Sequence, residues 1–357
     1  MKKLLVVSSK REATQEISFF EPIRLAPSSR IVFEHLNYSV SKKLLVNTTS
    51  TSHLKNVSPH CIILSRFTLN FAQKCIDYCR SHAVPCIFHL DDDLLNVPES
   101  IGKEKYNHYS SLEFRSLLDS LLKQVDRVLV STQALCDRLN ANGIKHTVVM
   151  PHYRSYTPGE PNAMTIYRPY PVIGYMGTAS HLVDLERIVP SIKTLLRRYS
   201  SLYFEAFGVD IPYSLQDEFP NQVKQHQKVN SYAEFLSSMK ELGWWAGLAP
   251  LEHSPFNLCK ANTKWVEYSE SGIPSIVELF GPFANLPSHN QAIGAMSLDD
   301  WDNGMDLLLR NPKVREEVLA NSVKSLKLNY NARDLINFYE SLLDSLELEV
   351  KGKGEIT

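Results

Sequence analysis

The sequence of 357 residues lacks an excess of charge of either sign, with 38 lysines and arginines against 39 aspartates and glutamates. A chain with so little net charge has no overall field to attract nucleic acid or an anionic membrane, so we expect no nucleic-acid partner. The sequence also lacks any apolar run near the length of about 18 residues that a spanning helix needs. Any contact with a membrane should therefore be peripheral.

Two further absences bear on the cellular compartment. The apolar run Leu4–Val7 is too short for the apolar region of a signal peptide, and we interpret it as part of a first strand. The six cysteines show neither paired C-x-x-C spacing nor the density of a disulfide scaffold. We therefore expect reduced, mostly buried thiols and a cytoplasmic protein.

Length and composition indicate two globular domains. A chain of 357 residues exceeds the size at which a single core stops growing, and 43% of its residues are hydrophobic. Strand and helix patterns alternate in both halves, as in doubly wound α/β sheets. We expect domains at 1–153 and 171–330, a proline-containing linker at 154–170, and a final helix with its tail at 331–357.

Apolar runs and helical periodicities predict the individual elements. In the first half the strands fall at 3–9, 58–66, 85–90, 127–131 and 145–150, and the helices at 69–81, 109–124 and 133–142. The stretch 10–30 is polar and predicts a loop-rich connection. In the second half the strands fall at 172–177, 203–209, 244–251, 275–279 and 292–297, and the helices at 185–198, 232–242, 300–309, 314–326 and 332–346, followed by a loose tail from Glu347.

The stretch Trp244–Val277 is predicted to form a strand, a loop, a helix and a second strand. Lys260, Lys264 and Glu267 recur at i, i+4 and i+7, which predicts one face of a helix, and Gly272 predicts the end of that helix. The N-terminus of such a helix favours an anion at the carboxyl end of the sheet. The lysines suit a diphosphate and Glu267 suits sugar hydroxyls. The alternative is a surface pair between Lys264 and Glu267, with Lys260 solvated.

A second candidate loop, Gly177 to His181, follows a buried strand and precedes a helix. Its small residues let the backbone approach a diphosphate, although the pattern is not the dinucleotide G-x-G-x-x-G. Thr178 and Ser180 are candidates to bind phosphate oxygens, and His181 to contact the phosphate or the departing sugar. The alternative for His181 and Asp184 is capping of the helix start.

Asp91, Asp92 and Asp93 follow an apolar strand. Three carboxylates in this position are suited to a divalent metal, or to holding or deprotonating an acceptor hydroxyl. The remaining interpretation is capping and a solvated surface. Arg66, at the carboxyl end of another strand, is placed to reach the same cleft.

Three stretches resemble GT-B glycosyltransferases. Residues 249–277, APLEHSPFNLCKANTKWVEYSESGIPSIV, resemble their donor-site segment, and residues 173–185, IGYMGTASHLVDL, resemble the strand and loop that open the same domain in bacterial polysaccharide glycosyltransferases. Residues 125–152, VDRVLVSTQALCDRLNANGIKHTVVMPH, resemble the end of the acceptor domain. The resemblance implies two Rossmann-like domains facing a cleft, with the last helix crossing back to the first domain.

The same resemblance implies transfer of a sugar from a nucleotide-sugar donor of the UDP, GDP or dTDP type to a hydroxyl of a cell-surface glycan or lipid-linked saccharide. The enzyme would be cytoplasmic or peripheral at the inner face of the membrane, and we expect neither a metal nor another cofactor. The implied donor-binding residues are Gly177, Thr178, Ser180, Asn257, Lys260, Lys264 and Glu267. The implied catalytic residues are Asp92, His181 and Lys260, and the acceptor side comprises Asp91, Asp92, Asp93 and Arg66.

One position departs from the family pattern. Retaining GT-B enzymes often carry two glutamates with seven residues between them; Glu267 matches the second, but Cys259 stands at the first. The donor sugar would then be contacted by Asn257, by Lys260 or by the backbone of the Pro255–Leu258 turn, and retention or inversion stays open. The missing glutamate also leaves open a non-catalytic nucleotide- or glycan-binding subunit, and the acidic run a metal-dependent GT-A transferase using Asp91–Asp93.

Overall fold

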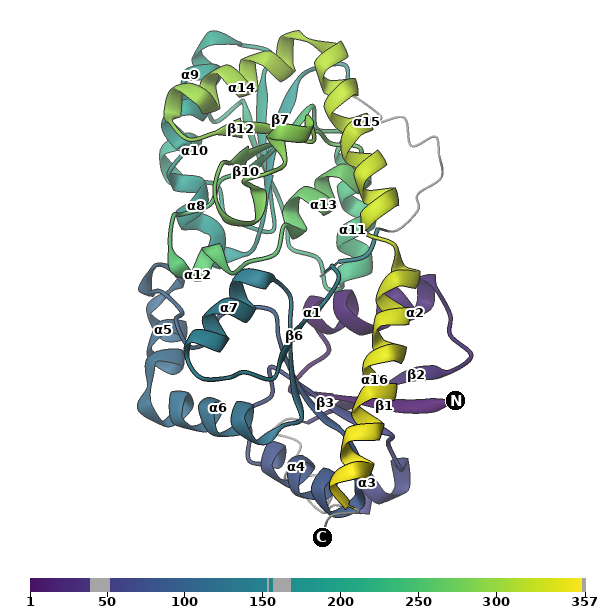
Figure 1. The fold of residues 1–357 in the computed structure, drawn as a ribbon. Coiled ribbons are helices and arrows are strands. Elements are labelled where there is room, and N and C mark those ends of the chain that lie inside the picture. The colour runs from purple at the N-terminus through teal and green to yellow at the C-terminus, as the bar shows by residue number, and fades with distance from the viewer. Residues whose placement is uncertain (39–51, 153, 157–167, 355–357) are drawn as a thin grey trace.

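The computed structural model describes residues 1–38, 52–152, 154–156 and 168–354. The chain forms two domains, each built on a six-stranded sheet in which neighbouring strands are parallel. Figure 1 shows the domains stacked end to end, with the last helix returning along the first domain. The predicted pair of doubly wound domains with a crossing helix is confirmed.

The first sheet has the strand order β2-β1-β3-β4-β5-β6. Its strands are β1 (Lys2–Ser8), β2 (Ile31–Asn37), β3 (Cys61–Ser65), β4 (Cys86–Leu90), β5 (Arg127–Val130) and β6 (Thr147–Val149). Its helices are α1 (Ala13–Gln15), α2 (Glu21–Leu25), α3 (Ser52–Val57), α4 (Phe71–His82), α5 (Lys103–Ser110), α6 (Leu112–Gln124) and α7 (Gln133–Ala141). Every residue of β3 and β4 is buried, as expected for central strands of a parallel sheet.

The second sheet has the order β12-β11-β10-β7-β8-β9, so the direction of winding reverses between β7 and β10. Its strands are β7 (Val172–Met176), β8 (Tyr203–Phe207), β9 (Val223–His226), β10 (Ala246–Ala249), β11 (Ser275–Glu278) and β12 (Ile293–Ala295). Its helices are α8 (Leu182–Glu186), α9 (Val189–Arg198), α10 (Tyr213–Glu218), α11 (Tyr232–Leu242), α12 (Pro255–Leu258), α13 (Thr263–Glu270), α14 (Leu298–Arg310) and α15 (Pro312–Asn329). Doubly wound sheets bind ligands at the carboxyl ends of the strands beside such a reversal.

Four expectations about secondary structure need correction. The stretch 10–30 is not a loop-rich connection, because helical turns run from Ala13 to Leu25 with a π-helix at Glu16–Phe20 in the middle. Strand β2 was not predicted, and α10 and β9 occupy a stretch predicted as loop. The tail from Glu347 is not loose up to Gly354, because the last helix continues there. Most of the predicted linker, 157–167, lies outside the described residues.

The last helix, α16 (Ala332–Gly354), covers one face of the first sheet. Buried side chains of α16 share a hydrophobic core with strand and helix residues of the first domain. These α16 side chains are Leu335, Ile336, Tyr339, Leu343 and Leu346. Because these side chains are at most 2% exposed, burial of apolar surface supplies most of the attachment.

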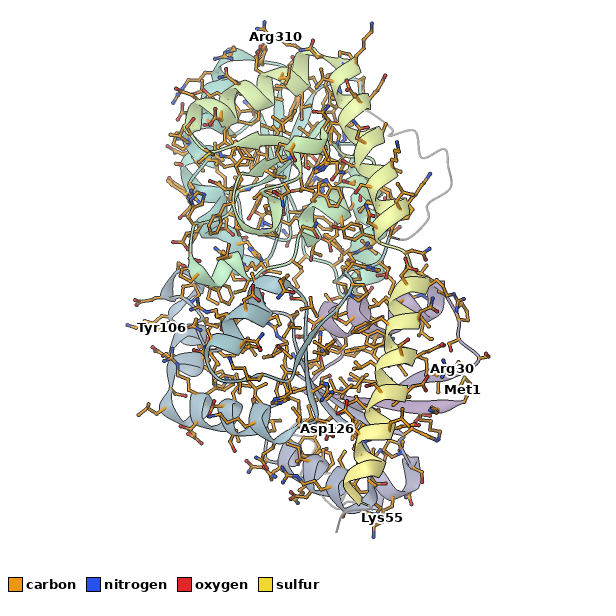
Figure 2. All side chains as sticks on the ribbon, viewed as in Figure 1. Met1, Arg30, Lys55, Tyr106, Asp126 and Arg310 are labelled. Atoms are coloured by element: carbon orange, nitrogen blue, oxygen red, sulfur yellow. The ribbon has the colours of Figure 1, made fainter. Side chains whose placement is uncertain are left out.

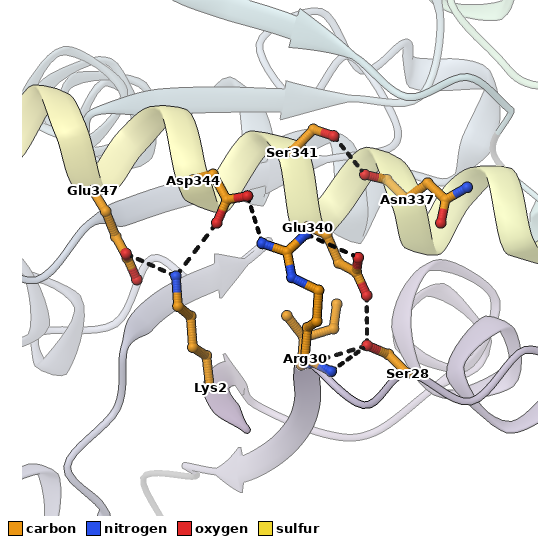
Figure 3. A network of polar contacts seen from close by, with 9 residues as sticks. Lys2, Ser28, Arg30, Asn337, Glu340, Ser341, Asp344 and Glu347 are labelled. Carbon is orange, nitrogen blue, oxygen red and sulfur yellow. Dashed lines mark hydrogen bonds and ion pairs between the residues drawn. The ribbon is translucent and has the colours of Figure 1, made fainter.

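Ion pairs flank this apolar contact (Figure 3). Lys2 lies 2.8 Å from Glu347 and 3.4 Å from Asp344, and Arg30 lies 2.5 Å from Asp344 and 3.2 Å from Glu340. Exposed pairs of this kind contribute about 0 to 1 kcal/mol each. These ion pairs therefore contribute less to the attachment of the helix than its buried apolar side chains do.

Candidate functional site

Helix α13 is anchored at the point where β7 and β10 separate. The Tyr268 hydroxyl donates to the carbonyl of Leu248 at 2.9 Å and accepts from the backbone N–H of Met176 at 3.1 Å. Gly247 makes room for this, since a Cβ there would lie 2.6 Å from the Tyr268 ring. The carboxyl ends of both strands are therefore fixed relative to α13.

Lys264 reaches from α13 across to β7. Its ammonium donates to the Tyr175 hydroxyl at 2.8 Å and lies 4.2 Å from the centre of the same ring. The pKa of Lys264 is lowered to about 8, mainly by burial and in part by the charge of Lys260, although Asp184 and Glu267 favour the charged form. A desolvated ammonium at a strand end binds an anion more strongly than a solvated one.

His181 and Asp184 are held to each other after β7. His181 Nδ1 lies 3.1 Å from an Asp184 oxygen, and the other carboxylate oxygen accepts from the backbone N–H of Glu252 at 2.9 Å. Burial, followed by the charge of Lys264, lowers the pKa of His181 to about 4, so the ring is neutral at pH 7. Because a carboxylate only accepts, Nδ1 carries the proton and Nε2 is an acceptor. His181 occupies the N-cap position of α8 and Asp184 lies in its first turn, as the capping alternative expects, but the His181 side chain makes no capping hydrogen bond.

The other residues of the loop Gly177 to His181 have small side chains. The Thr178 and Ser180 hydroxyls are 3.0 Å apart in an exposed contact. Gly177 has little space around its α-carbon, since a Cβ would lie 3.1 Å from the Cβ of His181. The loop is linked to Lys264 through the Tyr175 hydroxyl, which accepts from the Lys264 ammonium and donates to the carbonyl of His181 at 2.8 Å.

Lys260 does not share a helix with Lys264 and Glu267, so the prediction of one common face is wrong. Ser254 caps the short helix α12, which ends at Leu258, and α13 begins only at Thr263. Lys260 lies in the intervening turn, with its ammonium 5.2 Å from the centre of the Phe256 ring.

A cavity of about 450 Å³ lies between the domains. Thr132, Gln133 and His152 line it from the first domain and from the segment after β6, and Lys260 and Asn262 line it from the second domain. None of the described residues that line it is acidic. An anionic group in this cavity would face Lys260 and the N-terminus of α7.

Glu267 is buried, with 6% of its surface exposed, and it accepts from the Tyr232 hydroxyl at 2.8 Å. Burial raises the pKa of Glu267 to about 7, although Arg154 and the Tyr232 hydrogen bond favour the charged form. The alternative of a surface pair with Lys264 is wrong, because each of the two side chains has a different polar partner. Arg154, Tyr232 and Tyr175 were not predicted as site residues, since their roles depend on contacts between separate elements.

The turn at Asn257 and Cys259 packs against the first domain. The Asn257 amide donates to the carbonyl of Glu252 at 2.9 Å and is 4% exposed. Cys259 is buried in the core of the first domain, and its carbonyl accepts from the Thr132 hydroxyl at 2.7 Å. Burial raises the pKa of the Cys259 thiol to about 11, so the side chain is neutral and cannot replace a carboxylate electrostatically. All six cysteines are free and buried.

The acidic run forms a separate cluster in the first domain. Arg66 lies 2.8 Å from Asp91 and 2.7 Å from Asp92, while Asp93 pairs with Arg138. Asp91 and Asp93 are 8% and 1% exposed, so a solvated surface is ruled out for both, whereas Asp92 is 28% exposed. Arg66 has φ of 50°, a left-handed conformation that side chains other than glycine adopt at a cost.

The described residues contain no group of three or more histidine, cysteine, aspartate and glutamate side chains placed to hold a metal ion. The carboxylates of Asp91, Asp92 and Asp93 instead face two arginines. Of the helices that the structure describes, none has both the length and the apolar character that crossing a membrane requires.

Comparison with known proteins rests on structure. No protein-family model and no curated protein sequence matches the chain. HepE from Anabaena, solved with UDP-glucose, superposes with a TM-score of 0.67 and 13% identity, covering 97% of this chain and 100% of HepE. The chain has the GT-B fold. The trehalose-6-phosphate synthase OtsA matches this fold with a TM-score of 0.61 and 13% identity, over 96% of this chain and 99% of OtsA.

A third GT-B neighbour is S. aureus TarM, solved with UDP, Fondaparinux and alpha-GlcNAc-glycerol. It superposes with a TM-score of 0.58 and 10% identity, covering 82% of this chain and 58% of TarM. The alternative of a GT-A transferase built around Asp91–Asp93 does not fit the GT-B fold.

Proposed function

We propose that the chain is a glycosyltransferase that moves a sugar from a nucleoside-diphosphate sugar to a hydroxyl of a cell-surface glycan or lipid-linked saccharide. The observation that carries the proposal is the partly buried ammonium of Lys264 at the strand reversal. It is bonded to the Tyr175 hydroxyl, which donates to the carbonyl of His181 in the loop that carries Thr178 and Ser180. HepE was solved with UDP-glucose and TarM with UDP, which supports a nucleotide-sugar donor.

The leaving diphosphate is stabilised by Lys264 and Lys260, with the Gly177 backbone and the two loop hydroxyls as further donors. This interaction strengthens in the transition state, because negative charge develops on the departing phosphate. Loss of one such donor costs roughly 2.7–4 kcal/mol in the barrier. The lysines neutralise the diphosphate without a metal ion, and no other cofactor takes part.

The rest of the donor is held by neutral and acidic acceptors. Glu267 accepts hydrogen bonds from the ribose hydroxyls, and the bare Nε2 of His181 accepts from a hydroxyl of the transferred sugar. The buried Asn257 supports the turn that carries Lys260 through its bond to Glu252. The neutral Cys259 stabilises no positive charge on the sugar.

Asp92 acts as the base toward the acceptor hydroxyl. It is the most exposed of the three aspartates, and Arg66 fixes its carboxylate from a strained backbone position. Asp91 pairs with the same arginine, while Asp93 pairs with Arg138. The acceptor enters between the domains, where exclusion of water limits hydrolysis of the donor. The protein works in the cytoplasm, with peripheral contact at the inner face of the membrane.

The experiment is release of nucleoside diphosphate from UDP-glucose, UDP-N-acetylglucosamine, GDP-mannose and dTDP-glucose in excess chelator, with saccharide acceptors. The proposal predicts turnover of one donor that Lys264→Ala removes. It also predicts that Arg66→Met abolishes transfer to the acceptor while donor binding persists. Turnover that disappears in chelator would contradict the metal-free mechanism.

A second candidate is a non-catalytic nucleotide-binding subunit, favoured by the buried, neutral Cys259 at the glutamate position. It predicts binding of a nucleoside diphosphate without release of product from any donor. The same assay combined with a binding measurement therefore separates the two candidates.

A further inference from the structure

Arg154 is a buried cation in the segment that joins the two domains. It is 1% exposed and lies 2.5 Å from Glu270 of α13 and 3.8 Å from Glu21 of α2. A guanidinium stays charged in such surroundings, and burying it requires paired carboxylates. The two domains thus each contribute a carboxylate to one cation.

Arg154 also begins a directed chain of hydrogen bonds. Its Nε–H donates to the Tyr232 hydroxyl at 2.5 Å, and the Tyr232 hydroxyl donates to Glu267 Oε1 at 2.8 Å. Because the phenol oxygen already accepts from the guanidinium, its own proton points at Glu267. One oxygen of Glu267 is thereby fixed, and the other is left to accept from another donor.

We propose that Arg154 and Tyr232 are positioning residues that hold Glu267 oriented and ionised to receive the ribose of the nucleotide. The inference rests on the proposed function, which assigns the ribose to Glu267. The charged and titratable groups facing Glu267 are Arg154 from the joining segment, Tyr232 from α11, and Lys264 and Glu270 from α13. The first three favour the ionised carboxylate, and Glu270 opposes it.

Because Tyr232 favours the ionised form of Glu267 and Glu270 opposes it, variants of the two residues should change the pH dependence of nucleotide binding in opposite directions. Binding of UDP, GDP and dTDP to the full chain is measured by titration calorimetry from about pH 6 to about pH 9, a window that brackets carboxylates raised by burial. In Tyr232→Phe, the nucleotide that binds the wild type should bind about tenfold more weakly near neutral pH, the effect of one lost hydrogen bond to a charged group. The difference in affinity between Tyr232→Phe and the wild type should shrink as the pH rises. In Glu270→Gln the acid limb of the profile, which is the fall in affinity at low pH, should move to lower pH.

The chain offers a matched control. In Arg310–Tyr199–Asp306 an arginine Nε again donates to a tyrosine hydroxyl, at 2.8 Å, and that hydroxyl bonds to a carboxylate. Arg310 lies at the end of the second domain remote from the first (Figure 2). Tyr199→Phe should keep the wild-type pH profile.

A loss of affinity in Tyr232→Phe that is equal at every pH would mean that Tyr232 serves packing alone, and would overturn the inference. A shift of the acid limb in the same direction in Tyr232→Phe and Glu270→Gln would also overturn it. Arg154→Met should shift the limb further upward than Tyr232→Phe. If the wild type binds none of the three nucleotides, the proposed function itself fails, and the inference fails with it.

Discussion

Within the described residues, the ammonium of Lys264 is bonded to the phenol of Tyr175 and to no carboxylate. Its Nζ lies 2.8 Å from the Tyr175 hydroxyl and 4.2 Å from the ring centre. The phenol positions the ammonium without neutralising it, because burial keeps Tyr175 protonated by raising its pKa well above the usual value. The positive charge at the strand reversal is therefore available to a ligand.

Nucleotide affinity should have a maximum between about pH 7 and about pH 8. The pKa of Glu267 is raised to about 7, so its acceptor oxygens are fully charged only above that pH. The pKa of Lys264 is lowered to about 8, so its positive charge is lost as the pH rises further. Calorimetry of the wild type across this range checks the shape. A flat profile in the wild type would contradict the assignment of both residues.

Glu267→Gln should stabilise the protein at alkaline pH. The pKa of Glu267 is raised in the folded state to about 7, so the folded protein binds the proton more tightly and loses stability as the pH rises from the unfolded pKa to 7. Glutamine does not ionise, so the Glu267→Gln variant does not undergo this loss of folding stability, which amounts to at most about 3 kcal/mol. Urea unfolding at about pH 5 and pH 8 measures the difference. An equal effect of the substitution at both pH values would contradict the raised pKa.

Tyr268→Phe should destabilise the second domain through two orphaned backbone groups. The hydroxyl serves the Leu248 carbonyl and the Met176 N–H, and both groups are buried. Leaving buried groups unsatisfied costs roughly 1–3 kcal/mol each. The matched control is Tyr339→Phe, whose hydroxyl donates to the Ser18 carbonyl at 2.9 Å and serves no second group among the described residues. Denaturant unfolding should show the larger loss for Tyr268→Phe, and the reverse order would contradict the bridging role.

The attachment of α16 should depend on its apolar face and little on its ion pairs. Leu343 is 2% exposed within the shared core, so Leu343→Ala should cost roughly 2–5 kcal/mol. Arg30 is half exposed in its pairs with Glu340 and Asp344, so Arg30→Ala should cost about 0 to 1 kcal/mol and less in high salt. Chemical denaturation of both variants measures the two costs. A larger loss in Arg30→Ala would reverse the ranking.

Much of the fold could be predicted because both sheets are parallel. Central strands such as β3 and β4 are buried on both faces and appear as continuous apolar runs. The helical turns of residues 13–25 are not predicted, because their buried faces contain polar side chains. They bury polar side chains, including Gln15, which donates to Ser65, and Glu21, which lies near Arg154. A buried polar face cannot be told from a solvated one by composition.

The candidate site was only partly predictable. Spacing places Lys264 and Glu267 on α13 correctly, but the break before that helix depends on Cys259 packing into the other domain, which no local pattern reports. The chain from Arg154 through Tyr232 to Glu267 joins three separate segments. Such contacts follow from tertiary structure and carry no local sequence signal.

The most direct measurement is thermal unfolding in the presence of UDP, GDP, dTDP, CDP and CMP, with and without chelator, for the wild type, Lys264→Ala and the surface control Lys313→Ala. A ligand that binds only the folded state raises the melting temperature by mass action. We expect one nucleoside diphosphate to stabilise the wild type and Lys313→Ala regardless of chelator, and to have no effect on Lys264→Ala. Stabilisation by none of the nucleotides, or equal stabilisation of Lys264→Ala, would contradict a nucleotide-sugar site at the reversal between β7 and β10.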